Sequence, residues 1–252
     1  PGTAENQSAE AGVSQPFSYE DYATVLSTYV DDQGKVDYAQ LKENRTVLDR
    51  FNQSLGRVTQ EAYESWTEQE KIAFLVNAYN SLTLQAIIEN YPTESIRNIP
   101  GVWKFLKFQV LGKPMTLDEI EHQVLRKEFN EPRIHMALVC AAMSCPRLLQ
   151  EPYLGETLDS QLDKNTRVFL DDERNFKIEP EEGKVSVSSI FDWFGQDFEP
   201  TYGTEDKFTS FGSKERAVLN FVSNYLEEEQ VAKIEQAENF GYLDYDWSLN
   251  RQ

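Results

Sequence analysis

Residues 67–92, TEQEKIAFLVNAYNSLTLQAIIENYP, contain the strongest helical pattern of the chain. Thr67 can cap a helix, and Glu70 stands at the reciprocal position of a capping box. Apolar side chains then recur on one helix face, at Ile72, Leu75, Tyr79, Leu82 and Ala86. Pro92 disfavours helical geometry in the residue before it. We therefore predict a helix over residues 68–90 with one face toward the core.

Working outward, further helices alternate with short β-type segments. The predicted helices cover residues 18–28, 38–54, 116–129, 132–143, 157–171, 190–198 and 213–237. Two hairpins are predicted, 107–110 with 113–117 and 176–179 with 185–188, and the Tyr-rich residues 242–247 predict one more strand. The apolar run within 132–143 also fits a buried strand, because periodicity alone does not separate the two.

This order of elements predicts an α+β fold, mostly helical, and not a repeating βαβ pattern. Residues 17–252 contain no internal repeat and no linker, so we expect one globular domain with small antiparallel β-hairpins, in a papain-like or other cleft-bearing architecture. Residues 1–16 are small and polar, and we expect them to be flexible. Such a start often follows a removed export signal. We expect an exported protein (periplasmic, lipid-anchored or secreted), with a cytoplasmic one as the alternative.

The charge of the chain limits its partners. Among 252 residues, 43 are acidic and 24 are Lys or Arg, which gives a formal net charge of −19. This charge repels phosphate backbones and anionic lipids, so we expect no nucleic-acid partner. No apolar run approaches the roughly 20 residues that span a bilayer, so we expect no membrane insertion. A small molecule or peptide remains as partner, and the sequence does not indicate an oligomeric state.

Residues 133–146, RIHMALVCAAMSCP, hold both cysteines, Cys140 and Cys145, and one of the two histidines, His135. Clustering of such rare residues has three competing explanations. The first is thiol catalysis, the second is a disulfide or metal site, and the third is packing, because free cysteine is often buried as a small hydrophobe.

The sequence resembles the bacterial and plant family called domain of unknown function 547. The matching motifs are Phe74-x-x-Asn77-x-Tyr79-Asn80, Tyr91-Pro92, Leu117-Asp118-x-Ile120-Glu121-His122, Arg133-Ile-His135-x-Ala137-Leu138, Cys140, Ser144-Cys145-Pro146, Tyr153 and Ser188-Ser-Ile-Phe191-x-Trp193. They cover about residues 65–200. The resemblance implies a fold family but no catalytic residue.

Thiol catalysis would use Cys145 as the nucleophile, because it lies beyond the predicted helix in a turn fixed by Pro146. His135 or His122 would act as its base, and Glu121 could orient His135. Cys140 is the second thiol of this candidate site. The carboxamides of Asn77 and Asn80 share one helix face, and either could donate to an oxyanion or clamp a neighbouring loop.

A disulfide between Cys140 and Cys145 conflicts with a continuous helix. Two α-carbons five residues apart on a helix are roughly 8 Å apart, whereas a disulfide needs less than about 7 Å. A bridge therefore requires the helix to unwind after Cys140. Zinc is disfavoured because His135, Cys140 and Cys145 match no familiar zinc spacing. We expect no metal and no cofactor.

Two main hypotheses follow. The first is a cysteine-dependent hydrolase or acyltransferase that acts on an amide or thioester. The second is a non-catalytic binding or scaffold module of the cell envelope, in which the Cys, His and Asn residues are structural. A redox-active thiol pair is the alternative chemistry for the two cysteines.

Overall fold

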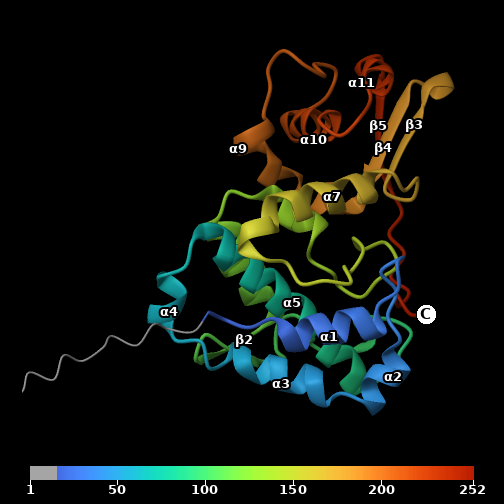
Figure 1. Ribbon diagram of the computed structural model, residues 1–252. Coiled ribbons are helices and arrows are strands. Elements are labelled where there is room, and N and C mark those ends of the chain that lie inside the picture. The colour runs from blue at the N-terminus through green and yellow to red at the C-terminus, as the bar shows by residue number, and fades with distance from the viewer. Residues whose placement is uncertain (1–15) are drawn as a thin grey trace, which may run out of the picture.

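The computed structural model describes residues 16–252, and residues 1–15 of the expected flexible segment 1–16 lie outside them. Helix α5 (Glu68–Asn90) occupies the centre of the lower part of the molecule (Figure 1). The predicted bounds and the capping box between Thr67 and Glu70 are both confirmed. The prediction that only one face of this helix is buried is wrong. Residues 72–84 of α5 are all buried, as expected of a helix surrounded by other elements.

Short helices and a hairpin surround α5. The surrounding elements are α1 (Glu20–Tyr29), α2 (Tyr38–Glu43), α3 (Thr46–Leu55), α4 (Gln60–Glu64), η1 (Ile96–Asn98), β1 (Phe108–Val110) and β2 (Lys113–Met115). The predicted helix 38–54 is thus divided at Asn44 and Arg45, whereas the predicted hairpin at 107–117 is confirmed. The apolar side chains of these elements form the first of two hydrophobic clusters.

The upper part of the molecule contains a three-stranded sheet and several helices (Figure 1). Its elements are η4 (Gly155–Thr157), α7 (Leu158–Leu170), β3 (Phe176–Glu179), η5 (Pro180–Glu182), β4 (Lys184–Ser188), α8 (Ser189–Phe194), η6 (Gly195–Phe198), α9 (Glu199–Tyr202), α10 (Ser213–Ser223), α11 (Glu228–Glu235) and β5 (Asn239–Leu243). Strand β4 pairs antiparallel with β3 and parallel with β5. The second hydrophobic cluster lies among these elements. The predicted helix 213–237 is therefore two helices, and the predicted C-terminal strand begins earlier, at Asn239.

The predicted helix 132–143 is wrong. Only η3 (Pro132–Met136) is helical, as a 3₁₀ turn, and the backbone is irregular from Ala137 to Pro146. Side chains from other helices satisfy this backbone in place of a helical ladder: Asn80 bonds Ala137 and Val139, and Asn165 bonds Met136. A helix is also incompatible with Ala141, whose φ is 60°.

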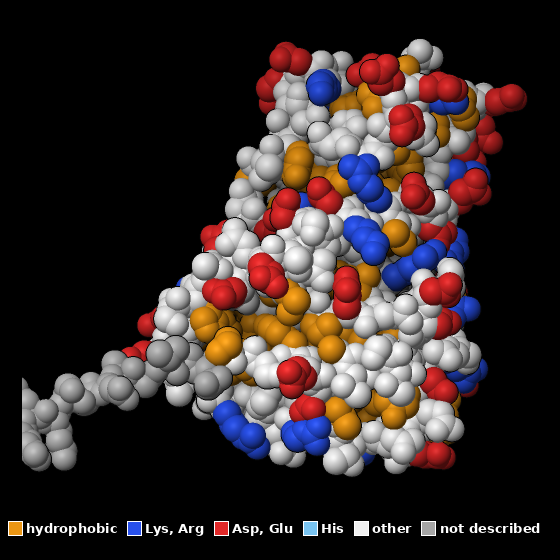
Figure 2. Space-filling view, in the orientation of Figure 1, with side chains coloured by type: hydrophobic (Ala, Val, Ile, Leu, Met, Phe, Trp, Pro, Cys, Tyr) orange, Lys and Arg blue, Asp and Glu red, His pale blue; other side chains and the backbone are white. Residues whose placement is uncertain are grey.

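The mostly helical α+β fold is confirmed. Acidic side chains are spread over the upper and lower parts of the face in Figure 2. In residues 16–252, no helix combines the length and hydrophobicity that a bilayer crossing requires.

Candidate functional site

A cleft of about 210 Å³ lies where the two hydrophobic clusters meet. The lower part contributes Tyr79 from α5, Trp103, the segment from Asp118 to His122, and Leu138. The upper part contributes Ile190, Trp193 and Phe194 of α8, and the C-terminal segment contributes Tyr245 and Trp247. His135 and Cys140 complete the wall. The cleft therefore contains both histidines, Glu121 and one cysteine.

The two cysteines form a disulfide, with α-carbons 6.2 Å apart. The unwinding after Cys140 that a bridge requires is present, since the backbone there is irregular. Cys140 lines the cleft and is partly exposed, whereas Cys145 is 8% exposed and lines a different hollow. The prediction that Cys145 faces the cleft as a free nucleophile needs correction. Its sulfur is bonded to that of Cys140, and the cysteine that lines the cleft is Cys140.

Two hydrogen-bond donors surround Cys145 Sγ. The backbone N–H of Cys140 donates to it over 3.1 Å. The hydroxyl oxygen of Tyr245 lies 3.1 Å from Cys145 Sγ and 3.3 Å from Cys140 Sγ. Burial raises the pKa of Tyr245, so its hydroxyl keeps its proton and remains a donor at neutral pH. A negative charge that develops on Cys145 Sγ would therefore meet two donors already in place.

Glu121 and His122 lie on η2 (Glu119–Leu125), a π-helix that begins after the capping box of Thr116 and Glu119. The prediction at 116–129 was an ordinary helix. A π-helical turn is wider than an α-helical one, and such turns are frequent at functional sites. In the wider turn, successive side chains differ less in direction. This is why the adjacent Glu121 and His122 both reach the cleft.

Glu121 is 8% exposed. Burial raises its pKa to about 7, Arg126 opposes the shift, and Asp118 adds to it. A carboxyl group with this pKa can both accept and donate a proton near neutral pH. Of the groups in the cleft, Glu121 is therefore the best suited to general acid–base chemistry.

His122 is hydrogen-bonded to Arg126. Arg126 can only donate, so its Nη1 donates to His122 Nδ1 over 3.0 Å, which leaves the ring proton on Nε2. That Nε2 lies 3.7 Å from Asp118 Oδ1. Burial lowers the pKa of His122, and Arg126 adds to this, although Asp118 opposes it. His122 is therefore a neutral imidazole at neutral pH.

His135 is 3% exposed and is held in place by Asp197. Its Nε2 donates to Asp197 Oδ2 over 2.8 Å, and its ring stacks on Phe194 with centroids 4.3 Å apart. Arg126 also binds both oxygens of Asp197. Burial alone would raise the pKa of Asp197, but the hydrogen bonds from His135 and Arg126 hold it well below its usual range. The expected orienting role of Glu121 toward His135 therefore belongs to Asp197.

Asn77 and Asn80 act as clamps on neighbouring backbone. Asn77 Nδ2 donates to the carbonyl of Tyr153 and its Oδ1 accepts from the N–H of the same residue. Asn80 bonds the carbonyl of Ala137 and the N–H of Val139 in the same way. Both side chains are buried, and neither lines the cleft. These contacts are those of the clamp alternative, so we do not assign Asn77 and Asn80 as oxyanion donors of the cleft.

Several site residues could not be found from the sequence. Tyr245 and Trp103 reach the cleft only through the tertiary fold, as Asp197 and Arg126 reach the two histidines. The Tyr-rich residues 242–247 predict a strand and carry no signal of a role in the cleft. The described residues contain no cluster of three or more His, Cys, Asp or Glu side chains that could hold a metal ion.

Part of the chain is similar to a known protein family. Residues 63–170 match the model of the family described as "Protein of unknown function, DUF547". This confirms the resemblance found in the sequence, and the match includes Glu121, both histidines and both cysteines. No curated protein and no solved structure matches the chain.

Proposed function

For a chain whose residues 63–170 match a family without an assigned activity, we propose that the cleft is the active site of a thiol–disulfide exchange enzyme. The Cys140–Cys145 disulfide is its redox centre, and its substrate is a dithiol of a small molecule or peptide. The observation that supports this most strongly is the asymmetry of the bridge: Cys140 lines the cleft, whereas the sulfur of Cys145 accepts a hydrogen bond from the Cys140 N–H and is the nearer of the two sulfurs to the Tyr245 hydroxyl.

This asymmetry determines the direction of attack. A substrate thiolate attacks Cys140 Sγ and forms a new S–S bond while the bond between Cys140 and Cys145 breaks. The bonding electron pair leaves on Cys145 Sγ as a thiolate. The N–H of Cys140 and the hydroxyl of Tyr245 are positioned to stabilise it, which lowers the pKa of the leaving thiol.

The second half of the reaction balances the electrons. The second thiolate of the substrate attacks its own sulfur in the mixed disulfide and releases Cys140 as a thiolate. The substrate becomes a disulfide, and the two protons that it loses end on the two cysteines. Glu121 lines the same cleft, and its pKa of about 7 suits it to take a proton from the incoming thiol and return it to a departing one.

A second candidate is acyl transfer or hydrolysis of an amide or thioester. It is favoured by the presence of Glu121, His122 and a cysteine in one cleft. The nucleophile in this case is Cys140 after reduction of the bridge. A scaffold module without catalysis would use the same residues for stability alone.

The proposed enzyme works where its bridge can persist. Disulfides persist in oxidising compartments and are rare in reducing ones. We therefore propose that the protein is exported, with periplasmic, lipid-anchored and secreted forms all compatible with this chemistry.

Two single variants separate these functions. Cys145→Ser leaves Cys140 as a free thiol that cannot close a bridge. We expect this variant to accept one equivalent of a small disulfide and then stop, whereas the wild type turns over a dithiol and a disulfide repeatedly. Cys140→Ser is the matched control and should react slowly, because the remaining thiol is that of the buried Cys145.

The outcomes are distinct. Turnover of a thioester by Cys145→Ser without any reductant would favour the acyl-transfer candidate. Exchange no faster than that of the urea-unfolded chain, together with no turnover of a thioester by wild type or either variant, would contradict both enzymes and leave the scaffold module.

A further inference from the structure

The charged and aromatic side chains of the cleft have a common preference for positive charge. Asp118 and Glu121 line it, together with Trp103, Trp193, Tyr245 and Trp247. Among the described residues that line it, none is Lys or Arg. Aromatic faces and carboxylates both attract cations, and the strength of this attraction rises in a partly desolvated site.

The rings form one continuous group. Trp193 stacks with Trp247 at a centroid distance of 5.7 Å, and Tyr245 lies 4.7 Å from Trp247. Trp103 meets Trp247 edge to face at 6.1 Å. The guanidinium carbon of Arg97 lies 5.3 Å from the ring centre of Trp247, so this aromatic group already holds one cation of the chain itself.

Three positively charged side chains, Arg97, Lys104 and Arg126, lie near the cleft, and none of them lines it. Arg126 binds both carboxylate oxygens of Asp197 and points a further N–H at His122. Lys104 follows Trp103 and is exposed to solvent. The lining groups next to Cys140 are therefore neutral or acidic.

We propose that the cleft selects thiol substrates that carry a positively charged amine close to the reacting sulfur. The ammonium group would lie against the Trp193–Trp247–Tyr245 rings and face Asp118 and Glu121. This inference rests on the proposed exchange function, and names the substrate class of the same site. It applies equally to a small aminothiol and to a cysteine beside Lys or Arg in a peptide.

Three small thiols of similar size test it: cysteamine, which is cationic; 2-mercaptoethanol, which is neutral; and 3-mercaptopropionate, which is anionic. Each is mixed with the oxidised protein, and the rate of bridge opening is measured. Every rate is divided by the rate of the same thiol with hydroxyethyl disulfide, which removes differences in intrinsic nucleophilicity. We expect the normalised rate for cysteamine to exceed that for 3-mercaptopropionate by about tenfold or more at physiological salt.

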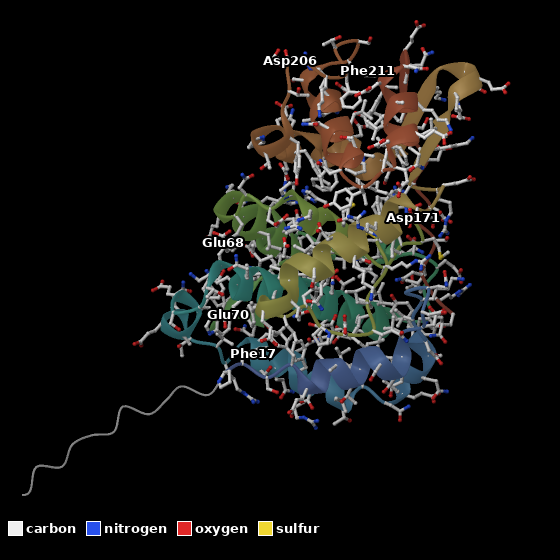
Figure 3. The ribbon with its side chains drawn as sticks, turned by 45° about the horizontal axis from the view of Figure 1, so that its top comes forward. Phe17, Glu68, Glu70, Asp171, Asp206 and Phe211 are labelled. Atoms are coloured by element: carbon white, nitrogen blue, oxygen red, sulfur yellow. A yellow bond between two sulfur atoms is a disulfide. The ribbon has the colours of Figure 1, made fainter. Side chains whose placement is uncertain are left out.

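A local site must be separated from the net charge of −19. Asp118→Asn removes one negative charge at the cleft and should lower the preference several-fold. Asp206→Asn removes one charge far away, in the upper part of the molecule (Figure 3), and should leave it unchanged. Trp193→Ala removes a ring that is 45% exposed, so the fold should tolerate it, and it should also lower the preference.

Equal normalised rates for the three thiols, or a faster anionic thiol, would overturn the inference while leaving the exchange function intact. A preference reduced equally by Asp118→Asn and Asp206→Asn would also overturn it, because general attraction would then be the cause. If no thiol opens the bridge faster than it opens hydroxyethyl disulfide, the proposed function itself fails.

Discussion

The hydroxyl oxygen of Tyr245 lies 3.1 Å from Cys145 Sγ, although the two residues are 100 positions apart in the chain. The C-terminal segment is thereby brought to the bridge, and the same segment supplies Trp247 to the cleft. A phenol hydroxyl beside a sulfur is a neutral donor, and it is most useful when that sulfur is negative. Through this contact, the C-terminal segment supplies a hydrogen-bond donor to the disulfide.

Replacement of Tyr245 by Phe should weaken Cys145 as a leaving group. Loss of one hydrogen bond to a thiolate should raise the pKa of the Cys145 thiol by about one unit and slow bridge opening several-fold. The pKa is measured by thiolate absorbance in the Cys140→Ser background. Tyr242→Phe is the matched control, since its hydroxyl contacts Glu215 and not a sulfur. An unchanged thiol pKa in the Tyr245 variant would show that the contact has no electrostatic role.

Glu121 should make the folded state less stable as pH rises. The folded chain keeps the Glu121 proton up to about pH 7, whereas an unfolded chain releases it near the ordinary value of 4.5. The folded state thus binds more protons in this interval, so the free energy of unfolding falls from pH 4.5 to 7. Glu121→Gln removes this contribution to the pH dependence of the free energy of unfolding. We expect its stability relative to wild type to rise across the interval by up to about 3 kcal/mol.

Urea unfolding of both proteins between pH 4 and 8 measures this difference. The comparison isolates Glu121, because every other titrating group is present in both chains. A constant difference across the range would mean that Glu121 titrates normally in the folded protein.

Asn80 should be essential for the segment that carries Cys140. Asn80→Ala leaves the buried Val139 N–H and Ala137 carbonyl without their partners. Each such group costs about 1–3 kcal/mol, so we expect a loss of about 3 kcal/mol of stability. Asn98→Ala, at an exposed position, should change stability by less than about 0.5 kcal/mol. Similar urea midpoints for the two variants would contradict the clamp.

The disulfide should make a modest contribution to stability, because the two cysteines are only five positions apart and the loop that it closes is short. Chain entropy predicts that reduction lowers the free energy of unfolding by about 2 kcal/mol. Urea unfolding with and without reductant measures this loss. The double variant Cys140→Ser/Cys145→Ser should be insensitive to reductant. A fold that collapses on reduction would instead identify the bridge as a structural staple, as the scaffold hypothesis requires.

Local signals predicted the elements that they control. The capping boxes at Thr67 and Thr116 and the hairpins at 107–117 and 176–188 are all present, because each depends on residues close together in the sequence. The helix predicted over residues 132–143 is absent, because the backbone there is hydrogen-bonded to Asn80 and Asn165 on other helices. Its apolar pattern predicts correctly that the segment is buried, but it does not indicate which groups form hydrogen bonds with the backbone.

The site was predicted in part for the same reason. The rarity of Cys and His drew attention to Cys140, Cys145, His122 and His135, and three of these four line the cleft. Which cysteine lines the cleft depends on the non-helical backbone around Ala141, and the partner of His135 comes from η6. Neither relationship depends on residues a fixed number of positions apart, so no sequence motif predicts it.

The central claim is that a substrate thiol attacks Cys140 and releases Cys145. The most direct test mixes the oxidised protein with cysteamine, quenches the reaction with an alkylating agent, and maps both cysteines by mass spectrometry. We predict cysteamine on Cys140 and the alkyl group on Cys145 at the earliest times. Cysteamine on Cys145, or equal labelling of the two sulfurs, would contradict this account.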